Sequence, residues 1–314
     1  MKMVGIGATT HVDKQNMRIT KEALEKAAED IQKGKVVPAM KIEHDTILPP
    51  IGKVTNGKVE KREDGEYQLV ITQELFNNVS DIKLPDGSTG ILESLTSDNR
   101  PFAMEGELEL SSDLKISVDY ANFESHEEYI KFRQEIKQAG EYEEGIISRK
   151  SFIPDPEMII AISKLVLAST FGKKVVEKLS DKVIDDGVPK ANEVIKKAVS
   201  SMARYCIPKN RPITYVFLIP GTFDIKLVVR TNEPNKAVAA ILQENLVEVL
   251  EKAKELHETL DANEIQFLLS EEGEWEFNFL LTNTGAVIGT PESYHKREKR
   301  IQLMYKQLEE KEKE

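Results

Sequence analysis

LKISVDY, residues 114–120, is a run in which apolar and polar side chains alternate. Successive side chains of a strand point to opposite faces, so a period of two predicts a strand with one buried face. Ser117 falls on the polar face of this strand, where a hydroxyl group can meet a substrate. Ser111 and Ser112 lie nearby, and the alternation favours Ser117 among the three.

Other patterns in the first half of the chain predict a strand-rich region with few helices. Thr20 stands where a helix N-cap belongs, Gly34 ends that helix, and a second helix is predicted over Glu124–Gln138. Asp64 and Gly65 predict a tight hairpin turn, and a bulge is predicted near Asn56. Residues 77–100 are rich in Ser, Asp, Asn, Gly and Pro and predict a long surface loop or a partly ordered insertion. The predicted strands are Val4–Thr9, Val36–Ile42, Ile51–Lys61, Tyr67–Thr72, Phe102–Leu110, Leu114–Tyr120 and Gly145–Phe152.

The second half begins with helical patterns over Pro156–Ser180 and Pro189–Tyr205. Ile159–Phe171 is the most apolar stretch, but it contains Lys164 and falls short of the roughly 20 residues that cross a bilayer, so we expect a buried helix. Strands are then predicted on both sides of a long amphipathic helix, in the order ββαββ. The predicted strands are Ile213–Ile219, Phe223–Arg230, Ile265–Ser270 and Trp275–Thr282.

These patterns predict an α+β protein with three parts. Residues 1–155 form a strand-rich domain, and residues 156–208 form a helical spacer. Residues 209–314 form a small ββαββ domain that binds a partner or ligand and ends in a charged surface helix from residue 292 onward.

Composition narrows the function classes. The net charge of −11 argues against general affinity for nucleic acid or for an anionic membrane, because phosphate groups recruit an excess of Lys and Arg. The single cysteine, Cys206, has no partner for a disulfide or a CxxC metal site, which favours a reducing compartment. The five histidines show no spacing typical of a metal site, and the glycines form no phosphate-binding motif. We therefore expect no metal and no cofactor.

His44 and Ser117 are the residue types of a general base and a nucleophile. Imidazole is the side chain whose ordinary pKa lies near neutrality, and a serine hydroxyl becomes a useful nucleophile when such a base takes its proton.

The segments around His44 carry a family resemblance. GIGATTHVDKQN (residues 5–16), ITKEAL (19–24), HD (44–45) and PIGKV (50–54) together resemble tailed-phage prohead (head maturation) proteases, which are distantly related to herpesvirus assemblin. The resemblance covers residues 4–153, about the first half of the chain, and implies a β-barrel domain. The C-terminal half shows no resemblance of this kind.

The resemblance implies a site in which His44 is the base and Ser117 the nucleophile. Asp119 stands where the family has a small residue after the strand serine. Glu144 is the candidate third residue that orients His44, with Asp119 and His126 as competitors. Arg149 is a candidate for placing positive charge near an oxyanion, and a plain surface strand explains it equally well.

The implied function is a serine endopeptidase that cleaves scaffold protein, capsid protein or itself. The expected partners are a protein substrate and, as an open option, further copies of the chain. The expected location is the cytoplasm of a host or an assembling virion.

Two alternatives stay open. One is a catalytically inactive relative that serves as a capsid-assembly or protein-interaction module. The other is a sensor or adaptor whose C-terminal domain binds the partner and whose first domain is the output.

Overall fold

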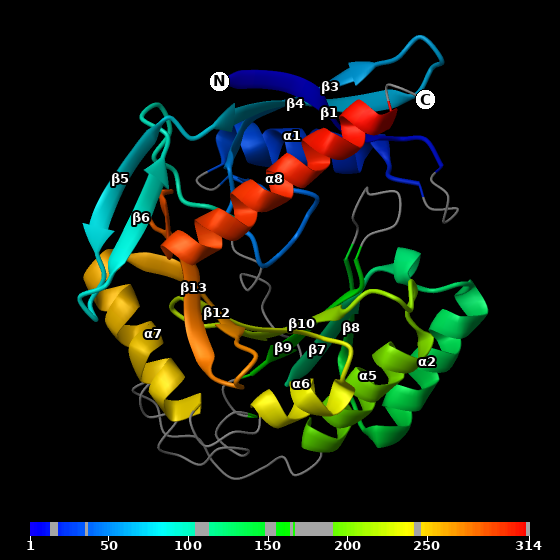
Figure 1. Cartoon of the computed structure of the whole chain (residues 1–314). Helices are drawn as coiled ribbons and strands as arrows, with labels where there is room; N and C mark the ends of the chain where they lie inside the picture. Colours follow the sequence, from blue (N-terminus) through cyan, green and yellow to red (C-terminus); the bar gives the residue numbers. More distant parts are fainter. Residues whose placement is uncertain are drawn as a thin grey trace. The chain divides into compact units, whose positions relative to one another are not determined.

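The structure is a computed structural model of the chain (Figure 1). It describes residues 1–12, 18–34, 37–103, 113–147, 155–163, 166, 191–241 and 246–311, apart from the side chains of 308 and 311. The chain divides into two compact units: Met1–Ala103 with Phe279–Glu314, and Met104–Asn278. Helices and strands occur in both units, which confirms the α+β class. No helix in the described ranges is long and apolar enough to span a membrane.

The first unit, which we call unit 1, contains an antiparallel sheet in the order β1, β4, β3, β2. Helix α1 (Lys21–Lys33) packs on it through Leu24 and Ala28, which join Leu69 in one apolar cluster. The predicted bulge is confirmed by a register shift between Val54 and Asn56. The strands are β1 (Lys2–Thr9), β2 (Ala39–Met40), β3 (Gly52–Lys61) and β4 (Tyr67–Leu75).

The predicted N-cap of α1 is confirmed, because the Thr20 hydroxyl accepts a hydrogen bond from the backbone N–H of Ala23 at 3.2 Å. The predicted hairpin turn is confirmed as well. Gly65 adopts a left-handed φ of 90° there, which glycine does without steric cost.

The prediction of a long loop over residues 77–100 is wrong. The segment forms a hairpin of β5 (Asn78–Lys83) and β6 (Thr89–Ser94), turned at Gly87 with a φ of 82°. Strand β6 also pairs with β14 (Val287–Gly289), almost two hundred residues later. Such a partner supplies backbone hydrogen bonds that local composition does not reveal.

Helix α8 (Pro291–Lys311) is attached to unit 1 through Arg297, which is 5% exposed. Its guanidinium group donates to both carboxylate oxygens of Glu93 at 2.7 and 2.8 Å and to the carbonyl of Pro50 at 2.8 Å. The buried ion pair with Glu93, made of two hydrogen bonds, joins α8 to β6. The hydrogen bond to Pro50 joins α8 to the loop before β3.

The second unit, unit 2, contains six neighbouring strands in the order β12, β11, β10, β9, β7, β8. The pairs β7–β8, β9–β10 and β11–β12 are parallel, whereas β7–β9 and β10–β11 are antiparallel. The chain leaves this unit along β13 (Trp275–Thr282). The strands are β7 (Leu114–Val118), β8 (Glu143–Ile146), β9 (Glu157–Ile162), β10 (Ile213–Ile219), β11 (Asp224–Thr231) and β12 (Ala262–Leu269).

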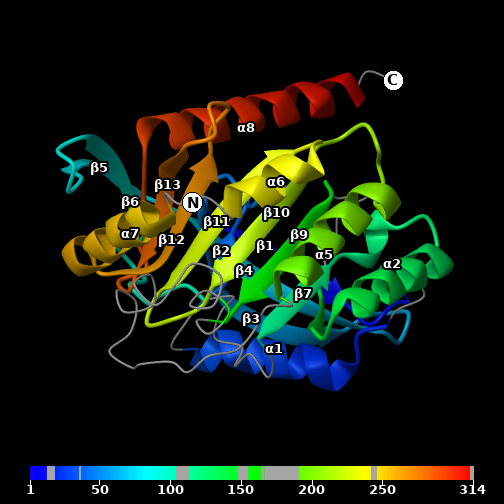
Figure 2. The same cartoon turned by 90° about the horizontal axis from the view of Figure 1, so that it is seen from below.

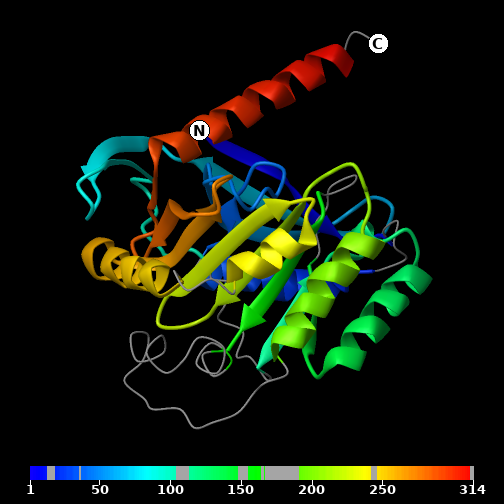
Figure 3. The same cartoon turned by 60° about the horizontal axis from the view of Figure 1, so that its bottom comes forward.

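Helices cover one face of these strands. Figures 2 and 3 show α2 (His126–Ala139), α5 (Ala191–Tyr205) and α6 (Pro234–Ile241) over β7, β9 and β10. Helices α2 and α5 are tied together by Glu135, whose carboxylate accepts from Ser201, Arg204 and Tyr205 at 2.7–2.8 Å. A further helix, α7 (Leu246–Leu260), packs against β12.

The prediction of a helix beginning at Pro156 is wrong, because Glu157–Ile162 forms β9 between β7 and β10. Its isoleucines are β-branched and fit a pleated, fully buried strand better than a helix. Of the predicted buried helix at Ile159–Phe171, the start lies in this strand and residues 164–165 and 167–171 lie outside the described residues. Residues 104–112 also lie outside the described residues, and they include most of the strand predicted over Phe102–Leu110.

The predicted boundaries at residues 155 and 208 both fall inside unit 2, which runs from Met104 to Asn278. The ββαββ strands are present as β10 to β13, but β10 pairs with β9, so the sheet continues into the preceding segment. In the described residues, the strands of the expected barrel over 1–155 are divided between the two units.

We expect Arg297→Met to destabilise unit 1 by about 3–5 kcal/mol, because it leaves the buried Glu93 carboxylate without its partner. The double variant Arg297→Met/Glu93→Leu should recover a large part of this loss. Hydrogen exchange at the α8 amides measures the effect, with the exposed Lys296→Met as control. Equal exchange in the single variant and the control would contradict it.

Candidate functional site

Ser117 lies on β7, between β8 and β9, and its side chain is half-buried. The flanking residues Ile116 and Val118 are buried on the opposite face, so the alternation predicted from the sequence is confirmed. The strand register places Gly145 of β8 and Ile159 of β9 directly beside Ser117.

Gly145 leaves the space that the Ser117 hydroxyl occupies. A Cβ atom built on Gly145 would meet Ser117 Oγ at 2.0 Å and Ser117 Cβ at 3.0 Å. Any larger residue at this position would force the serine side chain or the strand to move. The orientation of Ser117 therefore depends on a glycine in the neighbouring strand.

Lys115 lies two residues before Ser117 and shares its face of the sheet. Its ammonium group pairs with Glu143 of β8 at 2.6 Å, and both side chains are mostly buried. The register continues this row of side chains across the unit to Lys226 on β11. Lys226 is 1% exposed and pairs with Glu264 of β12 at 2.8 Å. The face that carries Ser117 thus holds two buried ion pairs, separated by apolar residues such as Ala161 and Leu218. The opposite face is mostly apolar and packs against helices.

Glu144 points to the opposite face from Ser117, because the register pairs it with Ile116. Its carboxylate accepts from Arg133 at 2.6 Å and pairs with Lys137 at 2.8 Å, both on α2. Partial burial acts to raise the pKa of Glu144, but the hydrogen bonds and charges of Lys137 and Arg133 outweigh it and lower the pKa. This geometry gives Glu144 a structural role between β8 and α2 and does not bring it to Ser117.

The competing candidates also have local roles. The Asp119 carboxylate is buried and accepts from the backbone N–H of Ala121 at 2.9 Å, so it caps the short 3₁₀ helix Tyr120–Asn122. His126 is exposed in the first turn of α2, directly after the N-cap Ser125. Arg149 lies outside the described residues.

His44 belongs to unit 1 and is exposed in a turn with unusual backbone geometry. Glu43 and His44 have φ values of 47° and 59°, in the left-handed region that costs a non-glycine residue roughly 1–2 kcal/mol. Contacts on both sides hold the turn. Glu43 pairs with Arg300 of α8 at 2.5 Å, and the Asp45 carboxylate accepts from the N–H of Ile47 at 3.1 Å. His44 and Ser117 are in different units.

The PIGKV segment after His44 has a structural role in unit 1. Lys53 is fully buried and donates to the carbonyls of Asp98 and Arg100 at 2.8 and 2.7 Å. Gly285 closes this site, since a Cβ there would meet Lys53 Nζ at 2.0 Å. Burial lowers the pKa of Lys53 to about 8, against the attraction of Asp98.

In the described part of the chain, no group of three or more His, Cys, Asp or Glu residues is arranged to hold a metal ion. Comparison of the chain with family models, curated proteins and solved structures found no match.

Sequence reasoning missed Lys115, Glu143 and Gly145 as the neighbours of Ser117. The period of two already places Lys115 on the serine's face. Helix α2 connects β7 to β8 and allows the two strands to pair in parallel. The register of this parallel pair decides which residues of β8 lie beside Ser117.

We expect Gly145→Ala to destabilise unit 2 by about 1–3 kcal/mol, because the new methyl group overlaps Ser117 Oγ. In a Ser117→Gly background the same change should cost clearly less. Urea unfolding followed by the fluorescence of Trp275, the single tryptophan, measures both. Equal costs in the two backgrounds would show that the overlap is not the cause.

Lys53 should make stability depend on pH. Its pKa is about 8 in the folded state and 10.5 in the unfolded state, so the unfolded chain binds more protons between these values. The free energy of unfolding of the wild type, measured by urea titration, should therefore rise from pH 8 to 10.5 relative to Lys53→Met. Lys58→Met, on the exposed side of the same strand, should keep the wild-type slope.

Proposed function

We propose that this protein is a serine endopeptidase of the prohead-protease type, with Ser117 as nucleophile and His44 as general base. The observation that carries the proposal is the placement of Ser117. Its hydroxyl lies in space left by Gly145, on the face of the sheet that also carries the ion pair of Lys115 with Glu143.

The turn at His44 supports the same proposal. Two consecutive left-handed residues that are not glycine are costly, and such backbone strain clusters at functional sites. The ion pair of Glu43 with Arg300 and the hydrogen bond of Asp45 hold the turn, so the exposed imidazole is presented on a defined backbone.

In the proposed reaction, His44 accepts the proton of Ser117 Oγ as the oxygen attacks the carbonyl carbon of a peptide bond. The C–N bond then breaks as His44 returns that proton to the leaving amine. Water repeats the sequence on the acyl-enzyme and releases the second product. Because Glu144 and Asp119 are committed to Arg133, Lys137 and a helix cap, the proposal assigns catalysis to the serine and histidine alone.

The substrate in this proposal is a scaffold or capsid-like protein, or the chain itself. This part of the proposal rests on the sequence resemblance of residues 4–153. A cytoplasmic location in a host or an assembling virion, and assembly of several copies, belong to the same proposal.

A second candidate is a non-catalytic relative that acts as an assembly or interaction module. Two contacts favour it: Glu144 is held by α2 on the far side of the sheet from Ser117, and Asp119 caps a helix in place of the small residue typical of the family.

The test is labelling with a fluorophosphonate probe, together with intact mass after incubation. We expect the wild type to be labelled, Ser117→Ala to show no label, and His44→Gln to be labelled about 10²–10⁴-fold more slowly, the usual contribution of a general base. Ser80→Ala, on an exposed strand position, is the matched control and should label like the wild type. Equal labelling or its complete absence in all four proteins, with no self-cleavage, would favour the non-catalytic module.

A further inference from the structure

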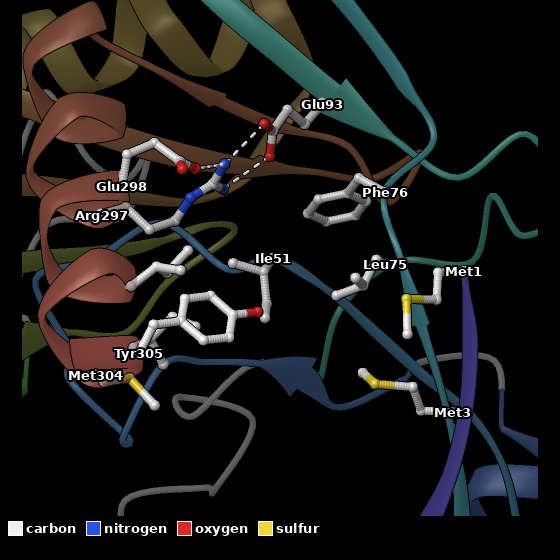
Figure 4. A pocket seen from close by; sticks show the side chains of 12 residues that line it. Met1, Met3, Ile51, Leu75, Phe76, Glu93, Arg297, Glu298, Met304 and Tyr305 are labelled. Atoms are coloured by element: carbon white, nitrogen blue, oxygen red, sulfur yellow. Dashed lines mark hydrogen bonds and ion pairs between the residues drawn. The ribbon is translucent and has the colours of Figure 1, made fainter. Parts of the chain in front are cut away.

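A pocket of about 410 Å³ lies within unit 1, a volume in the range of roughly 300–1,000 Å³ that binding pockets occupy. Figure 4 shows Met1, Met3 and Leu75, from β1 and the end of β4, on one side of the pocket and the middle of α8, from Arg297 to Tyr305, on the other. Its lining is mostly apolar and rich in methionine, whose flexible side chain adapts to varied partners. The residues that matter most are Met1, Met3, Leu75, Ile301, Met304 and Tyr305.

The buried charged pair at the pocket, Arg297 with Glu93, is neutral as a whole. Arg297 and Glu93 satisfy each other through two hydrogen bonds, drawn as dashed lines in Figure 4. Glu298 lies 3.7 Å from Arg297 and adds a second negative charge, but its side chain is 58% exposed and faces solvent. A buried pair of this kind favours an uncharged occupant, because an added charge would be desolvated without a partner.

Strand β1 forms one wall of the pocket and one edge of its sheet. Among the described strands it pairs only with β4. The carbonyl of Met1 accepts from the N–H of Leu75 at 3.0 Å and so points toward β4. On an edge strand of an antiparallel sheet, the backbone N–H and C=O groups of one residue point toward the neighbouring strand, and those of the next residue point away from it. Because Met1 points toward β4, the backbone groups of Lys2 and Val4 point away from the sheet.

This edge carries little of the usual protection against pairing. From Met3 to Thr9 it contains no charged residue and no proline, the two features that commonly block strand addition. Val4 and Ile6 are 71% and 56% exposed on the face opposite Met1 and Met3. An added strand would cover these two side chains and present alternate residues of its own toward the pocket.

We propose that β1 and the adjoining pocket bind an extended, uncharged peptide segment with alternating apolar residues. The peptide adds as a strand to the outer edge of β1 and places an apolar side chain among Met3, Ile301 and Met304. Backbone bonds to Lys2 and Val4 select a polypeptide over a hydrocarbon chain. The binding does not depend on the chemistry of Ser117.

The experiment is methyl NMR of the full chain labelled with ¹³C at the methionine methyl groups. The probe is a capped hexapeptide in which leucine alternates with threonine. We expect saturable shifts of the Met3 and Met304 signals, assigned by Met→Leu substitution. The buried Met158 and Met202 of unit 2 are internal controls and should not move.

Two matched pairs of variants locate the site. Val4→Pro removes an outward N–H and should weaken binding at least tenfold, whereas Val4→Thr keeps it and should bind within twofold of the wild type. Met304→Glu places a charge in the pocket and should also weaken binding at least tenfold. Leu303→Glu, one residue away and 43% exposed, should bind like the wild type.

Three results would overturn the proposal: no shift with the peptide, equal binding by Val4→Pro and Val4→Thr, or shifts with dodecanoate in place of the peptide. Ser117→Ala should bind the peptide normally. Failure of the protease proposal and failure of this one are therefore distinguishable.

Discussion

The pairing of buried cations is the constraint on which the rest of the structure depends. A buried cation has lost its hydrating water and needs oxygen acceptors from the protein. In unit 1 those acceptors come from distant parts of the sequence. Arg297 joins the last helix to Glu93 and Pro50, and Lys53 joins β3 to the carbonyls of Asp98 and Arg100. These bonds bring together segments separated by up to 247 residues and explain why the C-terminal helix belongs to the unit that contains the N-terminal strand.

In unit 2 the buried lysines and their carboxylate partners lie within a single sheet. One face is apolar and packs against helices, and the other carries Lys115 with Glu143 and Lys226 with Glu264. The serine lies on the face that carries these ion pairs, between Gly145 and Ile159. The helices on the opposite face stabilise the sheet and so hold the backbone around Ser117 in place.

The candidate site follows from these two arrangements. Ser117 is oriented by the absence of a side chain at Gly145, and His44 is presented by a strained turn that Glu43 and Asp45 hold. Glu144 is one position before Gly145 on β8 and therefore points to the opposite face from Ser117, because successive side chains of a strand alternate between faces. The apolar pocket beside β1 adds a surface that we propose recognises a peptide by its shape and its backbone.

The sequence by itself determined features that depend on near neighbours. The Thr20 cap, the Gly65 turn, the bulge before Asn56 and the outward placement of Ser117 all follow from periods and turn chemistry within a few residues. Tertiary structure alone decided the β5–β6 hairpin, the strand at Glu157–Ile162, the division into units and the ion pairs of Glu144. The physical reason is that strands and buried charges have partners far away in the chain, and no local sequence pattern identifies those partners.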